Sequence, residues 1–80
     1  MMNNFDIFAF KGRLDQISDQ AEVDRLIREK IRQLLDEGYS PDEILKIFQR
    51  ERLFEAQGNE EMIKNHQAYV EMAKRALGKK

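Results

Sequence analysis

The apolar positions between Asp19 and Glu37 recur every three or four residues, which is the spacing of one helix face. Asp19 stands where an N-cap is expected, Glu22 follows three residues later as in a variant capping box, and Gly38 is typical of a helix end. We therefore predict a helix over about residues 19–37. Its apolar stripe consists of Val23, Leu26, Ile27, Ile31, Leu34 and Leu35.

A second helix begins at the strongest local signal in the chain. Ser40 is a good N-cap, Pro41 suits the first helical position, and Glu43 completes a capping box. We predict a helix over about residues 41–57. The short connection that starts at Gly38 predicts an antiparallel hairpin with the preceding helix.

The apolar residues of this second helix change face along its length. Ile44, Ile47 and Phe48 share one face, whereas Leu53 lies on the opposite side. The stripe breaks at residues 49–50, where the helix either kinks or continues with a second apolar face. A helix that is apolar on two faces needs two neighbours. The second neighbour is either another part of this chain, or a second copy or partner protein.

The last predicted helix spans about residues 59–77. Asn59 is a good N-cap directly after Gly58, and Gly78 follows the last periodic position. Residues 78–80 are expected to be a frayed basic tail. The expected packing face consists of Met62, Ile63, Tyr69, Val70, Ala73, Ala76 and Leu77.

Residues 1–17 form an aromatic N-terminal arm whose apolar spacing favours a short helix over a strand. Gly12 weakens that helix by about 1 kcal/mol relative to alanine. The arm either covers the open end of the helical core or docks on a partner. Its apolar residues are Phe5, Ile7, Phe8, Phe10, Leu14 and Ile17.

Length and composition indicate one small helical domain over residues 1–80. The chain is 41% hydrophobic and 36% charged and contains no cysteine, so no disulfide or thiolate metal site can stabilise it. We predict an all-α fold, a small irregular bundle of one short N-terminal helix and three longer helices. Self-association is common in chains this short, and a homodimer is therefore expected.

Charge and hydropathy narrow the choice of partners. The 14 basic and 15 acidic residues give a net charge of -1, without the basic footprint that phosphate binding requires. Protein partners are therefore expected, and nucleic acid is not. No apolar run approaches the roughly 18 residues of a membrane span, and the N-terminus does not resemble a signal peptide. We predict a protein without a membrane partner, in the cytoplasm of a cell or an infected host.

The sequence offers few groups for catalysis, cofactor binding or metal binding. Its single histidine, His66, lies between Met62 and Tyr69 on the packing side of the last helix, and we interpret it as a partly buried core residue. Neither a metal-ligand pattern nor a glycine-rich phosphate loop is present. We predict that the protein is not an enzyme and has no cofactor.

The segment from Ser40 to Gln57 begins like the first helix of a DNA-binding helix-turn-helix. That motif needs a small residue where this chain has Leu45, and a turn residue where it has Gln49. Because the segment starts like the motif but departs from it at these two positions, a DNA-binding regulator is the alternative function and not the preferred one.

The preferred prediction is a non-catalytic protein that acts as a regulator, adaptor or inhibitor by binding another protein or a second copy of itself. Aromatic residues and arginine are enriched at such interfaces. The predicted partner-binding residues are Phe5, Phe8, Arg50, Arg52, Leu53 and Phe54.

Overall fold

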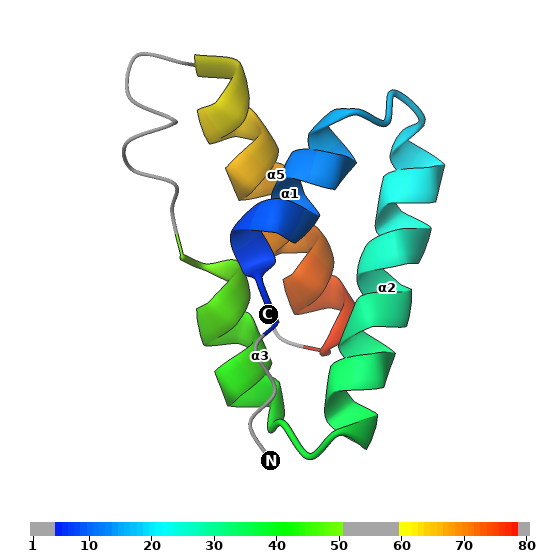
Figure 1. Ribbon diagram of the computed structural model, residues 1–80, viewed down its shortest axis with the longest axis vertical. Helices are drawn as coiled ribbons and strands as arrows, with labels where there is room; N and C mark the ends of the chain where they lie inside the picture. Colours follow the sequence, from blue (N-terminus) through cyan, green and yellow to red (C-terminus); the bar gives the residue numbers. More distant parts are fainter. Residues whose placement is uncertain (1–4, 51–59, 79–80) are drawn as a thin grey trace.

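The structure is a computed structural model that describes residues 5–50 and 60–78. This part of the chain forms four helices and no strand, which confirms the predicted all-α bundle (Figure 1). The helices are α1 (Ile7–Asp15), α2 (Gln20–Asp36), α3 (Pro41–Phe48) and α5 (Glu60–Ala76).

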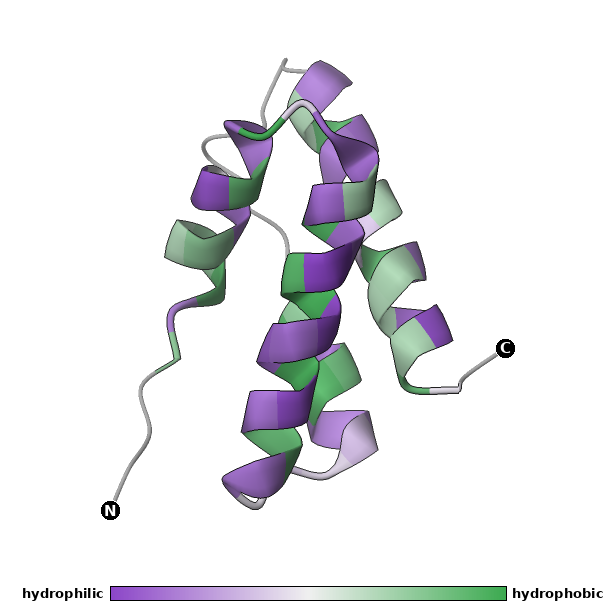
Figure 2. Ribbon diagram, turned by 90° about the vertical axis from the view of Figure 1, so that its right-hand side faces the viewer, coloured by the Kyte–Doolittle hydropathy of each residue, from purple (hydrophilic) through white to green (hydrophobic). Residues whose placement is uncertain are grey.

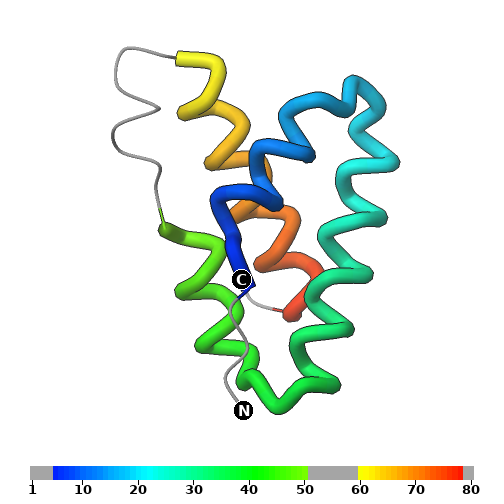
Figure 3. Tube along the Cα trace, in the orientation of Figure 1, coloured from blue at the N-terminus to red at the C-terminus, as the bar shows by residue number. Residues whose placement is uncertain are grey.

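Three of the described helices, α1, α2 and α3, pack around the fourth, α5. Helices α2 and α3 form the predicted antiparallel hairpin, joined at the bottom of Figure 1, and α1 crosses in front of α5. The tube in Figure 3 shows the same path, with α1 rising while α5 descends behind it. Segments from both ends of the chain therefore lie side by side.

The core contains apolar side chains from every described helix. Helix α2 buries one side only, and the face that it turns to the viewer in Figure 2 is largely hydrophilic. The core residues are Ile7, Phe10, Leu14, Val23, Ile27, Ile31, Leu34, Ile44, Ile47, Phe48, Tyr69, Met72 and Ala73.

Helix α2 begins and ends where its sequence predicts, but its N-terminal contacts differ. The Asp19 carboxylate accepts a hydrogen bond from the Ala21 amide at 3.0 Å. Glu22 does not close a capping box, because its carboxylate pairs with Arg25 at 2.6 Å. Gly38, with a φ of 102°, follows the helix in the left-handed region that favours glycine.

The start of α3 confirms the predicted capping box. The Glu43 amide donates to the Ser40 hydroxyl at 3.1 Å, and the Ser40 amide donates to the Glu43 carboxylate at 2.9 Å. Pro41 occupies the first turn, where its missing N–H removes no helical hydrogen bond.

The end of α3 differs from the prediction, since the helix stops at Phe48 after eight residues and is followed by the non-helical Gln49 and Arg50. Residues 51–57 of the predicted helix lie outside the described part of the chain. Gln49 is the C-cap, with a φ of -78°, at the point where the apolar stripe changes face. The predicted second apolar face lies in residues 51–59, outside the described part of the chain.

Aromatic contacts hold the N-terminal arm against the core, and residues 7–15 form the predicted short helix. Phe10 is buried, and its ring makes edge contacts with Phe5 at 5.7 Å and with Phe48 at 6.2 Å between ring centroids. Ile7 is also buried. Most of the arm therefore belongs to the monomer's own core, which leaves Phe8 as its exposed aromatic residue.

Helix α5 buries Tyr69, Val70, Met72 and Ala73, close to the predicted face. Ile63 departs from that prediction, because 42% of its surface is exposed. It lies in the first turns of α5, which extend beyond the end of α3 in Figure 1. The predicted cap Asn59 is outside the described residues.

Candidate functional site

A buried lysine joins α1 to the end of α3. Lys11 is completely buried, and its ammonium donates hydrogen bonds to the carbonyl oxygens of Phe48 and Arg50, both at 2.7 Å. The last carbonyls of a helix lack intrahelical donors and carry the negative end of the helix dipole, so a cation is favourable there. Lys11 thus caps α3 and holds Arg50 close to α1.

His66 provides the third contact of this lysine. Its Nδ1 lies 2.8 Å from the Lys11 Nζ, which connects α5 to the junction of α1 and α3. An ammonium group can only donate, so a charged Lys11 requires Nδ1 to accept and the ring proton to reside on Nε2. The predicted placement of His66 as a partly buried packing residue is confirmed.

A second polar contact fixes α1 on α5. The Tyr69 hydroxyl donates to the Asp15 carboxylate at 2.6 Å, and the Asn65 amide donates to the same oxygen at 3.2 Å. Lys11 and Asp15 therefore attach α1 to its neighbouring helices at two points that lie one helical turn apart. The residues that α1 exposes are therefore presented on a fixed element.

An open groove lies between the start of α1 and the end of α3. Its volume is about 430 Å³, and we call it the α1–α3 groove. Phe8 contributes an exposed ring, 41% of whose surface is accessible, and Arg50 contributes an exposed cation. The groove is lined by Phe5, Asp6, Ile7, Phe8, Tyr39, Ile47 and Arg50.

Three of the predicted partner-binding residues meet in this groove, namely Phe5, Phe8 and Arg50. That they bind a partner stays a prediction. The other three predicted residues lie outside the described part of the chain. These are Arg52, Leu53 and Phe54.

Sequence reasoning missed the contribution of Tyr39 and Ile47 to the groove, and it missed Lys11. A signal for Lys11 was present, since it follows Ile7 by four residues and precedes Leu14 by three. That spacing places it on the buried face of α1. For Tyr39 no such periodic signal exists, because it lies in the connection between helices.

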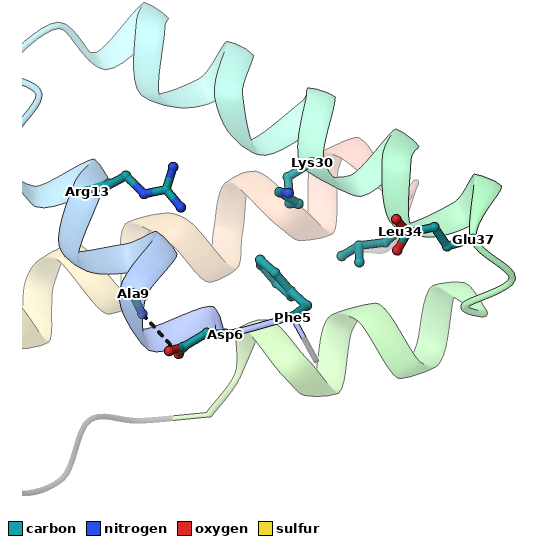
Figure 4. Close-up of a pocket in the computed structure, with 7 residues that line it drawn as sticks. All are labelled: Phe5, Asp6, Ala9, Arg13, Lys30, Leu34 and Glu37. Carbon is teal, nitrogen blue, oxygen red and sulfur yellow. Dashed lines mark hydrogen bonds between the residues drawn. The ribbon is translucent and has the colours of Figure 1, made fainter. Parts of the chain in front are cut away.

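A smaller cavity adjoins the groove on the other side of Phe5. It has a volume of about 260 Å³, and we call it the α1–α2 cavity. In Figure 4 the Phe5 ring lies between α1 and α2, with Lys30 above it and Arg13 farther along α1. The Lys30 ammonium is 5.2 Å from the centroid of that ring, within cation–π range. The cavity is lined by Phe5, Asp6, Ala9, Arg13, Lys30, Leu34 and Glu37.

Other classes of site find little support in residues 5–50 and 60–78. This part of the chain contains no group of three or more side chains placed to hold a metal ion. None of its helices combines the length and apolarity that crossing a membrane requires. The cytoplasmic location and the absence of catalysis stay predictions.

Helix α3 also bears on the alternative of DNA binding. Gln49, which would occupy the turn of a helix-turn-helix, has a negative φ of -78° and caps the helix. Any recognition helix would have to follow Arg50, outside the described residues. DNA binding thus stays an untested alternative.

No protein-family model, curated protein or solved structure matches this chain.

Proposed function

We propose that the protein is a non-catalytic binding protein whose α1–α3 groove receives apolar side chains of a partner protein. Through this contact it would act as a regulator, adaptor or inhibitor. The observation that carries the proposal is the exposed Phe8 ring at an apolar groove that also contains Arg50. Aromatic residues and arginine are the residue types that most often dominate binding energy.

The way the groove is built supports a role in binding. Lys11 holds the end of α3, and Asp15 holds α1 on α5, so both walls are fixed before a partner arrives. Elements that are already held in place lose less conformational entropy on binding than elements that become ordered only in the complex. Phe8 is not an isolated exposed residue, because it lines a groove with the apolar side chains of Phe5, Ile7 and Ile47, and contiguous apolar surface is what marks an interaction site.

A peptide selection tests this proposal. A displayed library of helical peptides is selected against the wild-type protein and counter-selected against Phe8→Ala, and affinities are then measured by fluorescence anisotropy. We expect Phe8→Ala to weaken the selected peptides about tenfold or more, the loss of about 1.4 kcal/mol typical of an interface anchor.

Two exposed aliphatic residues serve as matched controls. Leu35 and Ile63 are as exposed as Phe8, at 41% and 42%, but neither lines the α1–α3 groove. Leu35→Ala and Ile63→Ala should change peptide affinity less than about twofold. Failure to obtain any peptide that depends on Phe8, or equal losses in all three variants, would overturn the proposal.

A second copy of the chain is the other candidate occupant, as expected for a homodimer. Sedimentation equilibrium of the wild type and of Phe8→Ala distinguishes the two cases. A dimer that dissociates on Phe8→Ala identifies the second copy as the partner. A monomer at all concentrations removes the homodimer and leaves the groove to another protein.

A further inference from the structure

The α1–α3 groove and the α1–α2 cavity form one continuous surface. Phe5 and Asp6 line both of them, so a partner seated in the groove also reaches the cavity. We infer that this surface selects an acidic partner, an amphipathic helix whose apolar anchor is flanked by aspartate or glutamate. This inference rests on the proposed function and specifies the chemistry of the partner.

The cations of this surface are available for such a partner. The guanidinium groups of Arg13 and Arg50 make no ion pair or hydrogen bond with any residue that the structure describes. Arg13 lines the cavity, and Arg50 lines the groove, so one cation stands on each side of the shared residue Phe5. Lys30 adds a third positive charge, with its ammonium bound to Gln33 at 2.7 Å.

The acidic residues of the same surface already have partners. The Asp6 carboxylate caps α1, accepting hydrogen bonds from the amides of Phe8 and Ala9 at 3.1 Å each. Glu37 is likewise engaged in an interaction within the chain. These contacts do not remove the two negative charges, so three cations against two carboxylates give this surface a net charge of +1, although the whole chain carries a net charge of -1.

The separation of apolar and charged groups favours a peptide over a nucleic acid. Phe8, Ile47 and Tyr39 line the groove together with Arg50, and this apolar surface fits an apolar side chain better than a run of phosphates. Complementary charges at the rim of an interface mainly raise the association rate and fix the orientation of the partner. Glutamates on both sides of an apolar anchor match this arrangement.

The test uses the Phe8-dependent peptide from the selection, synthesised in three versions with Glu, Gln or Lys at the positions that flank its apolar anchor. We expect the Glu version to bind about tenfold tighter than the Gln version at low salt, and the Lys version to bind most weakly. The preference for Glu should shrink at high salt because exposed charges are screened.

Variants then locate the preference on the protein. Arg13→Gln and Arg50→Gln should each reduce the ratio of Glu to Gln affinity about threefold, because each removes a cation that only the Glu version can pair with. Arg75→Gln is the matched control, because Arg75 lines a separate groove between α2 and α5. It should leave the ratio unchanged.

The outcomes separate this inference from the proposed function. Equal affinity for the Glu and Gln versions, or a preference that survives both arginine variants, overturns the inference while groove binding stands. Absence of any Phe8-dependent peptide overturns the proposed function itself. A DNA duplex that binds through Arg13 and Arg50 more tightly than the Glu peptide would assign the surface to nucleic acid and also overturn the inference.

Discussion

At the scale of single residues, Lys11 is the buried charged side chain among the described residues. Its ammonium donates hydrogen bonds to the main-chain carbonyl oxygens of Phe48 and Arg50, for which α3 itself supplies no donor. Lys11→Met keeps most of the side-chain volume but leaves both carbonyls without that donor. Because buried polar groups without partners are unfavourable, we expect the free energy of unfolding to fall by about 1 to 3 kcal/mol.

Urea denaturation followed by circular dichroism measures this loss. Lys64→Met is the control, since Lys64 is an exposed residue of α5, and its substitution should change stability by less than about 0.5 kcal/mol. A Lys11→Met protein as stable as the wild type would show that the lysine contributes no net stability.

The ion pair on the outer face of α2 predicts a measurable titration. The hydrogen bond from Arg25 lowers the pKa of Glu22 below its ordinary value of 4.5. A depressed carboxyl pKa adds stability that is present above the ordinary value and is lost as the pH falls through the lowered one. Since 40% of the Glu22 side chain is exposed and the pair is therefore screened by water, the effect on stability is small, and the pKa itself is the useful observable.

Arg25→Gln should return the pKa of Glu22 toward 4.5, as measured by carboxyl ¹³C NMR against pH. Arg28→Gln removes a neighbouring cation that pairs with Asp24 at 3.1 Å, and it should leave the Glu22 titration nearly unchanged. An identical titration of Glu22 in wild type and Arg25→Gln would contradict the assigned cause.

At the scale of elements, local sequence predicts where helices begin better than where they end. Ser40, Pro41 and Glu43 predict the start of α3 because an N-cap acts within four residues. The end of α3 involves Lys11, which is 37 residues away from Phe48 in the chain. The apolar pattern near Phe48 cannot predict this distant contact. The break in the apolar stripe at residues 49–50 nevertheless coincides with the end of α3.

The contact between α5 and the junction of α1 and α3 gives a prediction at the same scale. His66→Asn retains an acceptor oxygen close to the position of Nδ1, whereas His66→Leu removes it. We expect the Asn variant to keep most of the stability. The Leu variant should lose about 1 to 2 kcal/mol, because one N–H group of the Lys11 ammonium then lacks an acceptor.

Thermal and urea unfolding of both variants measure this difference. In the wild type, ¹⁵N NMR of the imidazole should show the proton on Nε2, as a donor at Lys11 requires. Proton occupancy at Nδ1, or equal stability of the Asn and Leu variants, would contradict the proposed role of the histidine as an acceptor.

At the scale of the whole molecule, the sequence predicted three of the seven residues that line the groove. The aromatic arm pointed to Phe5 and Phe8, and the charged break after α3 pointed to Arg50. Apolar composition alone could not divide the arm into core and surface, because that division depends on how α1 lies against α3. Tyr39 and Ile47 could not be assigned to the groove from sequence for the same reason, since their place in its lining depends on how the helices pack.

This division of the arm predicts that its phenylalanines have separate effects on folding and binding. Phe10 is 7% exposed and packs on Phe48, so Phe10→Ala should destabilise the fold by about 3 to 5 kcal/mol. Phe8 is 41% exposed, so Phe8→Ala should lose less than about 1 kcal/mol of stability and still weaken binding of the selected peptide about tenfold or more. Urea denaturation and fluorescence anisotropy on the same samples measure both quantities. If Phe8→Ala unfolds as readily as Phe10→Ala, Phe8 belongs to the core and the groove loses its anchor.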